Sequence, residues 1–265
     1  MKKVIFLLTF FLIIVTEIFS QGEIDDQQRL FYRNERTWGG NLSSTGYGAS
    51  YRYAKRINFF NQRLYEVGFN VVRHPKEIRI SNPYYPGNRS FIFGKENFFF
   101  NLRGGIGFQR TKFKKLDKGG VAVRFLYSGG LSLGFYKPVY YQVYKQSPNN
   151  TYIIVTEKFN ATLHSPQDIV SRASFFKGFN EIKLSPGLFA RGGINFEFGK
   201  ADPIISSLEI GATLDAYIKK IPIMASDDNR QIFPAIYISF RFGKIVDPKS
   251  EKKLKYLEKQ GTGSY

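Results

Sequence analysis

VAVRFLYSGGLSLGFYK, residues 121–137, alternates between two kinds of residue at every second position. One row is apolar or aromatic apart from a single glycine, and it comprises Val121, Val123, Phe125, Tyr127, Gly129, Leu131, Leu133 and Phe135. The other row is mostly small or polar and contains Arg124. A period of two is that of a β-strand. Because the run is about three times as long as a typical soluble strand, it indicates a strand with lipid on one side and a crowded polar interior on the other.

The same alternation recurs along the chain, at 37–53, 62–74, 97–111, 181–198, 206–219 and 231–244. The backbone N–H and C=O groups at an open sheet edge have no hydrogen-bond partners in lipid, so the strands must close into a barrel. The predicted fold is therefore all-β, an antiparallel up-and-down transmembrane β-barrel over 37–244. Bacterial barrels have an even number of strands, so we expect eight, with ten as the alternative. The strand still missing is either 151–159 or a division of the region before Tyr53, and the fourth strand could continue through Pro138 to Tyr144.

The two ends of the chain read differently from the barrel. Residues 1–20 combine a basic start (Met1-Lys2-Lys3), an apolar stretch over 4–15 and a small residue, Ser20, which is the pattern of a cleaved secretory signal peptide. Residues 21–36 are predicted to be a polar lead-in. Residues 245–265 are rich in Lys and Glu and are predicted to form a basic tail on the periplasmic side.

Composition narrows the functional classes. The chain has no Cys, which excludes cysteine nucleophiles and Cys-based zinc sites. Its net charge of +18 suggests nucleic acid as a possible class of partner. The predicted export of the chain, and the lack of a basic helix or a nucleic-acid motif in its sequence, argue against that partner. Outer-membrane lipid and lipopolysaccharide phosphates are the expected counter-charges.

Sorting the strand residues by parity predicts a charged lumen. The charged residues at inward positions are Arg52, Glu66, Arg103, Arg124, Arg191, Glu197, Glu209, Asp215 and Arg241. Unpaired ions inside a narrow barrel would carry a large desolvation cost. The near balance of cations and anions therefore predicts a salt-bridge network that plugs the barrel.

Single residues offer weaker signals. Trp38, the only Trp, fits an interfacial aromatic girdle, and core packing is the ordinary alternative. The only histidines are His74 and His164, and Ser165 follows the second of them. Sequence adjacency is no evidence of a catalytic triad. Asp227-Asp228-Asn229 is interpreted first as a turn, where Asp and Asn are common, and a calcium site is the weaker alternative. No catalytic, cofactor-binding or metal-binding residue is predicted.

The chain resembles the small outer-membrane β-barrel proteins of Gram-negative bacteria, similar in plan to the barrel of OmpA. The resemblance is carried by the signal-like segment 1–20, by the alternating strands 121–135, 181–198 and 206–218, and by the aromatic-ended strand 235–242. It implies a bacterial outer-membrane location. Such barrels often end on a terminal Phe, whereas here 243–265 follow Phe242, which suggests that a partner docks on the tail.

Three functions follow from these observations. The first is a non-enzymatic structural or accessory subunit that contacts a periplasmic or outer-membrane protein through its loops and tail. The second is a lipid-modifying enzyme, which would need a base and a nucleophile near the membrane interface. The third is a small-solute channel or ligand-binding barrel, which a balanced, filled lumen disfavours.

Overall fold

The computed structural model describes residues 33–85, 87–115, 120–146, 152–199, 204–226 and 228–246. The predicted signal peptide, most of the predicted lead-in, Asp227 and the tail beyond 246 lie outside these ranges. Within the described part of the chain, no helix has the length and apolar character needed to cross a membrane.

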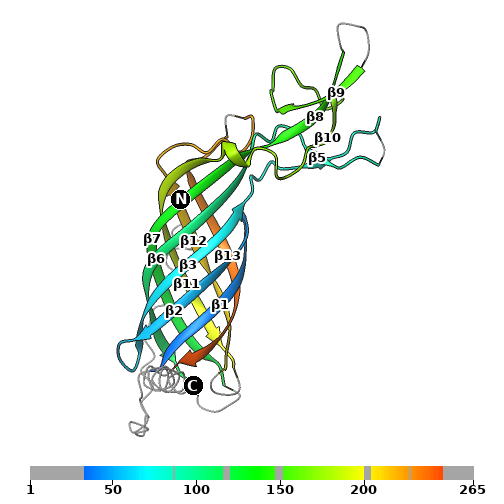
Figure 1. Ribbon diagram of the computed structural model, residues 1–265. Coiled ribbons are helices and arrows are strands. Elements are labelled where there is room, and N and C mark those ends of the chain that lie inside the picture. The colour runs from blue at the N-terminus through cyan, green and yellow to red at the C-terminus, as the bar shows by residue number, and fades with distance from the viewer. Residues whose placement is uncertain are drawn as a thin grey trace, which may run out of the picture. The chain divides into compact units, whose positions relative to one another are not determined.

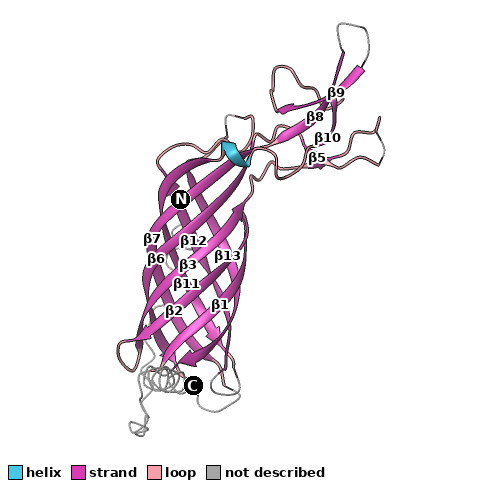
Figure 2. Cartoon of the chain, in the orientation of Figure 1, coloured by secondary structure: helices cyan, strands magenta, loops and turns pink. Residues whose placement is uncertain are grey.

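Eight antiparallel strands close into a barrel, shown in Figures 1 and 2. They are β1 (Asn34–Ser43), β2 (Gly46–Arg56), β3 (Asn61–Val72), β6 (Asn97–Phe113), β7 (Ala122–Pro138), β11 (Lys183–Glu197), β12 (Ile204–Tyr217) and β13 (Ile232–Val246). Each pairs with the next barrel strand, and β1 closes the ring against β13 from Asn34↔Val246 to Ser43↔Tyr237. The predicted all-β, up-and-down barrel of eight strands is confirmed.

The strand that the sequence left unassigned comes from a division of the region before Tyr53. Residues 37–53 were expected to form one strand, but β1 and β2 form a tight hairpin there. The turn contains Ser44 and Thr45 and leads into Gly46, which has φ +153°. A Cβ on Gly46 would lie 1.9 Å from the carbonyl oxygen of Val71, so only glycine fits. The barrel also begins earlier than the expected residue 37, at Asn34.

Alternation separates the two faces of the wall. On β7, Leu131 points outward with 71% of its surface exposed, while the neighbouring Ser132 is 2% exposed inside the barrel. The outer face carries large apolar side chains on every barrel strand, as with Val67 on β3 and Ile236 on β13. In a monomer, so much exposed apolar surface is compatible with a lipid environment and not with water.

The two ends of the barrel differ in their connections. The long connections 73–96, 139–182 and 218–231 leave one end, which we call the loop end. The connection 57–60, the ends of β6 and β11 and the starts of β7 and β12 lie at the opposite end, which we call the turn end, whereas the short turn 44–45 lies at the loop end. The start of β1 and the end of β13 also lie at the turn end.

Two of the long connections, 73–96 and 139–182, form a small lobe, the loop lobe. It contains a two-stranded sheet of β4 (Arg79–Ile80) and β5 (Phe91–Ile92), and a three-stranded sheet in the order β10-β8-β9. The latter strands are β8 (Tyr140–Gln146), β9 (Tyr152–Lys158) and β10 (Ile169–Arg172), followed by the short 3-10 helix η2 (Phe179–Glu181). Tyr141 joins the two segments, since its hydroxyl donates to the carbonyl oxygens of Ile92 at 2.7 Å and Lys95 at 2.9 Å.

Two sequence expectations about this region need correction. Residues 140–144 do not extend the fourth barrel strand, because β7 ends at Pro138 and β8 belongs to the lobe sheet. Residues 151–159 do contain a strand, but β9 pairs with β8 and takes no part in the barrel. Periodicity detects a strand without identifying the sheet that it joins.

Candidate functional site

A four-residue ionic cluster occupies the middle of the lumen. Arg52 Nη2 lies 3.0 Å from Glu66 Oε2, and Arg52 Nη1 lies 2.6 Å from Glu209 Oε2. Arg191 contacts the same two carboxylates, with Nη2 2.7 Å from Glu209 Oε1 and Nη1 bonded to Glu66 Oε1. Glu209 also accepts a hydrogen bond of 2.8 Å from the Tyr237 hydroxyl. Each carboxylate thus bridges two guanidiniums.

These ion pairs cross the barrel. In the ring order β1-β13-β12-β11-β7-β6-β3-β2, β2 faces β11 and β3 faces β12. Arg52 on β2 reaches Glu209 on β12, and Arg191 on β11 reaches Glu66 on β3. The cluster therefore occupies the central bore from wall to wall.

A second ionic group lies toward the turn end. Arg124 bonds to Glu35 at 2.8 Å and to Glu197, and the Lys115 ammonium lies 2.9 Å from Glu197. Gln62 donates to Glu35 at 2.6 Å. Here too β7 and β1, which carry Arg124 and Glu35, stand across the ring from each other.

Two further lumen arginines have different partners: Arg103 forms an ion pair with Asp215, and Arg241 forms hydrogen bonds to uncharged groups. Arg103 forms a two-nitrogen contact with Asp215, whose Oδ1 accepts Nε at 2.8 Å. Among the described residues, Arg241 contacts no carboxylate at hydrogen-bonding distance, and its Nη1 donates to Ser50 Oγ at 2.9 Å. Gly39 lies beside it, where a Cβ would come within 2.8 Å of Arg241 Nη1. Inward glycines thus make room for the long arginine side chains.

An apolar cluster, the apolar cap, lies at the loop end of the barrel. Inward side chains near the ends of the strands pack with residues of the connection after β12. The cluster consists of Val72, Phe99, Tyr217, Ile221, Ile223, Met224 and Phe233. Phe99 is 5.3 Å from Tyr217 and 5.5 Å from Phe233 between ring centroids. The lumen thus holds an ionic cluster in the middle and an apolar cluster at this end.

All nine charged residues selected by parity lie inside the barrel, and eight of them contact an opposite charge. Sequence reasoning missed Glu35, because the first strand was expected to start after it. Extending the alternation back from Thr37 would have placed Glu35 inside. It also missed Tyr237, which was assigned inward without a role.

Trp38 lies on the outer wall with 68% of its surface exposed, and its ring is 4.7 Å from that of Tyr51. It therefore faces the lipid side and not the core.

The two histidines do not share a site in the part of the chain that the structure describes, and Asp227 of the acidic turn lies outside that part. His164 Nε2 is 2.8 Å from Glu157, whereas the Ser165 hydroxyl donates to Asp168 at 2.7 Å and not to His164. Those hydrogen bonds to Asp168, from the hydroxyl and the backbone of Ser165, lower the pKa of its carboxyl. His74 Nδ1 accepts the backbone N–H of Lys76. No group of three or more His, Asp or Glu side chains in the described ranges could hold a metal ion.

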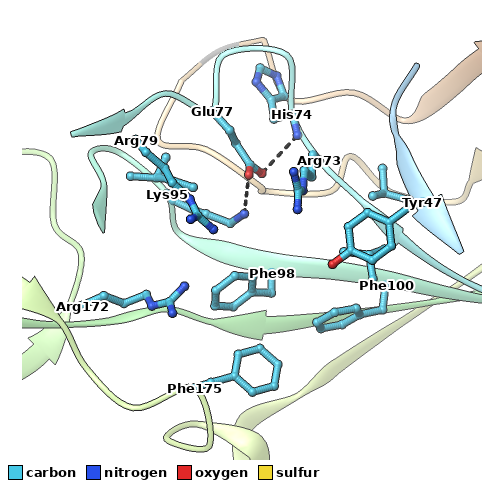
Figure 3. A pocket seen from close by; sticks show the side chains of 13 residues that line it. Tyr47, Arg73, His74, Glu77, Arg79, Lys95, Phe98, Phe100, Arg172 and Phe175 are labelled. Carbon is cyan, nitrogen blue, oxygen red and sulfur yellow. Dashed lines mark hydrogen bonds and ion pairs between the residues drawn. The ribbon is translucent and has the colours of Figure 1, made fainter. Parts of the chain in front are cut away.

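A second candidate site is a pocket at the loop end, the rim pocket, of about 420 Å³. In Figure 3, Arg73, Glu77, Arg79 and Lys95 lie on one side and aromatic rings on the other. Lys95 is 4% exposed and its ammonium lies 2.7 Å from Glu77 Oε2. Burial lowers the pKa of Lys95, and Glu77 only partly opposes that shift.

A closed eight-stranded antiparallel wall with an apolar exterior and a polar interior defines a small outer-membrane β-barrel protein. The class expected from the OmpA-like pattern is thereby confirmed.

No protein-family model matches the chain, and no curated protein matches it. Among solved structures, it is similar to Neisserial surface protein A (NspA), with a TM-score of 0.35 and 10% identity, over 80% of this chain and 96% of that one. It is also similar to Ail, the attachment invasion locus protein of Yersinia pestis, solved in complex with the heparin analogue sucrose octasulfate. That match has a TM-score of 0.37 and 6% identity, over 82% of this chain and 100% of Ail.

Proposed function

We propose that this protein is a non-conducting outer-membrane barrel that acts as a structural or accessory subunit and presents its loop lobe to a protein partner. The observation that carries the proposal is the cluster of Arg52, Glu66, Arg191 and Glu209, which spans the bore. A solute would have to separate buried ion pairs at that level. Breaking such pairs leaves uncompensated charge and costs several kcal/mol.

The connection lengths support an orientation. Outer-membrane barrels have short periplasmic turns and longer extracellular loops. The loop end of this chain then faces the cell exterior, with the lobe outside the membrane. The start of β1 and the end of β13 face the periplasm, so the segment beyond Val246 begins on that side.

The lobe offers an edge suited to a protein partner. Strand β9 is an outer strand of the sheet β10-β8-β9, and Tyr152, Ile153 and Ile154 on it are exposed. An exposed apolar edge strand presents unpaired backbone groups that can take a further strand. We infer that a partner would add to β9.

Conductance in planar bilayers tests the filled lumen. The wild-type barrel should show no stable open steps. Replacing the four cluster residues together with Ser removes the central obstruction. The conductance of this variant should be larger than that of the wild type. Replacing Lys145 and Glu157, an ion pair of the lobe at 2.7 Å, with Ser is the matched control. Stable conductance by the wild-type protein would overturn the proposal.

Crosslinking in native membranes followed by mass spectrometry tests the partner. A stoichiometric neighbour should be recovered with the wild-type chain and lost with Ile153→Asp on β9. Leu163→Asp also places a charge at an exposed apolar position of the lobe but off β9, and it should retain the neighbour. If no stoichiometric neighbour is recovered with the wild-type chain, the accessory-subunit role is wrong.

A further inference from the structure

The rim pocket lies on the lipid-facing side of the barrel. Tyr47, Val71 and Phe100 line it and occupy outward positions on β2, β3 and β6. They are neighbours in register, Tyr47↔Val71 and Val71↔Phe100. Farther from the loop end, Phe69 and Leu102 continue the same outer surface and are exposed. The floor of the pocket is thus continuous with the apolar wall that contacts lipid.

The opposite side of the pocket is strongly cationic. Arg73, Arg79 and Lys95 lie there, Arg172 lies beside Phe98 (Figure 3), and Glu77 is the one carboxylate among the lining residues. Glu77 is already engaged by the Lys95 ammonium at 2.7 Å and by the backbone N–H of His74 at 3.1 Å. Within the described residues, the three guanidiniums have no carboxylate partner, and the buried Arg172 Nε has no hydrogen-bond acceptor.

The cations crowd around one aromatic ring. The Lys95 ammonium is 4.6 Å from the centroid of Phe98, the Lys137 ammonium 5.4 Å and the Arg172 guanidinium carbon 5.9 Å. Cation–π attraction offsets part of their mutual repulsion. Like charges this close, in partly desolvated surroundings, still repel one another. An anion placed among them would remove that repulsion.

We propose that the rim pocket binds the phosphate-bearing headgroup of an anionic lipid of the outer leaflet. The guanidiniums of Arg73, Arg79 and Arg172 hold the phosphate oxygens, for which their planar donors are well suited. Phe98, Phe100 and Tyr47 contact the apolar part of the lipid as its chains run down the barrel wall. Aromatic side chains at headgroup level have this role in membrane proteins.

A lipid fits the pocket better than a soluble phosphate does, because the two walls demand different chemistry. A free phosphate or phosphorylated sugar would use the arginines alone. An anionic lipid places its head against the arginines and its chains against exposed apolar side chains such as Phe69. This site is independent of the lumen, so its failure would leave the proposed filled barrel unaffected.

The test uses the full-length protein in phosphatidylcholine nanodiscs doped with lipid A that carries both phosphates, or with dephosphorylated lipid A. Bound lipid is counted by native mass spectrometry. The variant is Arg73→Gln, Arg79→Gln and Arg172→Gln together. Its control is Lys145→Gln, Lys219→Gln and Lys220→Gln, three exposed lysines outside the pocket that give the same loss of charge.

The wild type and the control should retain phosphorylated lipid A, and the arginine variant should bind it about a hundredfold more weakly. Dephosphorylated lipid A should bind the wild type as weakly as the variant does. Equal retention by the variant and the control would overturn the proposal. Soluble glucosamine 1-phosphate tests the other source of phosphate, and if it binds as tightly as lipid A, the site is not a lipid site.

A variant that is expected to bind lipid A more tightly distinguishes the proposal from simple misfolding, which could only weaken binding. Glu77→Gln keeps an acceptor for the His74 N–H but removes the carboxylate that competes for the cations. It should bind phosphorylated lipid A about fivefold more tightly, in proportion to one charge. Weaker binding by Glu77→Gln would contradict the electrostatic basis of the site.

Discussion

The lumen and the rim pocket both contain several arginines, but the two regions differ in whether those arginines have carboxylate partners. In the lumen, carboxylates such as Glu66 and Glu209 each bind two guanidiniums, and the charges are sealed from solvent. In the rim pocket, the guanidiniums of Arg73, Arg79 and Arg172 have no described carboxylate partner. The difference teaches that internally balanced charge serves the fold, whereas unbalanced charge at an opening serves an outside anion.

The largest expected effect comes from unbalancing the lumen. Glu209→Gln removes the carboxylate shared by Arg52 and Arg191, and two buried cations then depend on Glu66 alone. Removing one partner of a buried pair destabilises by about 3–5 kcal/mol. Urea unfolding of the barrel in lipid vesicles measures it. Arg79→Gln in the rim pocket is the matched comparison and should change stability by less than about 0.5 kcal/mol. Similar costs at both positions would remove the distinction.

A charge added to the outer wall should cost somewhat less. Leu131 is exposed to lipid near the middle of β7 and pairs with Leu188 on β11. Leu131→Arg should destabilise by about 2–4 kcal/mol, as for arginine near the bilayer midplane. The same unfolding assay measures it, with Leu131→Met as the control. A neutral result would show that this part of the wall does not face lipid.

The third effect removes one hydrogen bond from the lumen cluster without changing its charge. Tyr237→Phe deletes the hydroxyl that donates to Glu209 Oε1 at 2.8 Å. Because the acceptor is charged and buried, the loss should be about 1.5–3 kcal/mol. Combining Tyr237→Phe with Glu209→Gln should lower the free energy of unfolding little more than Glu209→Gln alone, because both changes act on the Glu209 carboxylate. Full additivity in this double-mutant cycle would separate Tyr237 from the cluster.

The smallest effect is a pH dependence at the rim. Burial lowers the pKa of Lys95 from its ordinary 10.5, so the unfolded lobe binds more protons than the folded one between the lowered pKa and 10.5. Stability of the lobe should therefore rise with pH in that window. Tyr141, whose pKa burial raises from 10.0, has the opposite effect only above pH 10.0. Protease nicking of the lobe below pH 10.0 measures the rise, which should disappear in Lys95→Met.

The sequence predicted the parts of the molecule that obey a period. Alternation along 121–137 gave both faces of β7, and the same rule selected inward residues such as Arg124 and Asp215. It failed at 44–45, where a turn of Ser and Thr interrupts no hydrophobic pattern, and so the hairpin and Glu35 were missed. The rim pocket could not be predicted, because its arginines lie in the connections 73–96 and 139–182, which have no repeating pattern, and only the folded connections bring them to Tyr47 on β2.

The crossing ion pairs have a consequence for the order of folding. Arg52 and Glu209 are 157 positions apart in the sequence, and they lie on β2 and β12, which are not neighbours in the ring. The β2–β3 and β11–β12 hairpins can each form one Arg–Glu pair, Arg52–Glu66 and Arg191–Glu209, but the two pairs that join these hairpins need strands that are distant in the sequence. Contacts of such high sequence separation form late. The charged interior therefore makes insertion cooperative, because a sheet that has not closed in the correct register lacks the ion pairs that cross the bore, such as Arg103–Asp215.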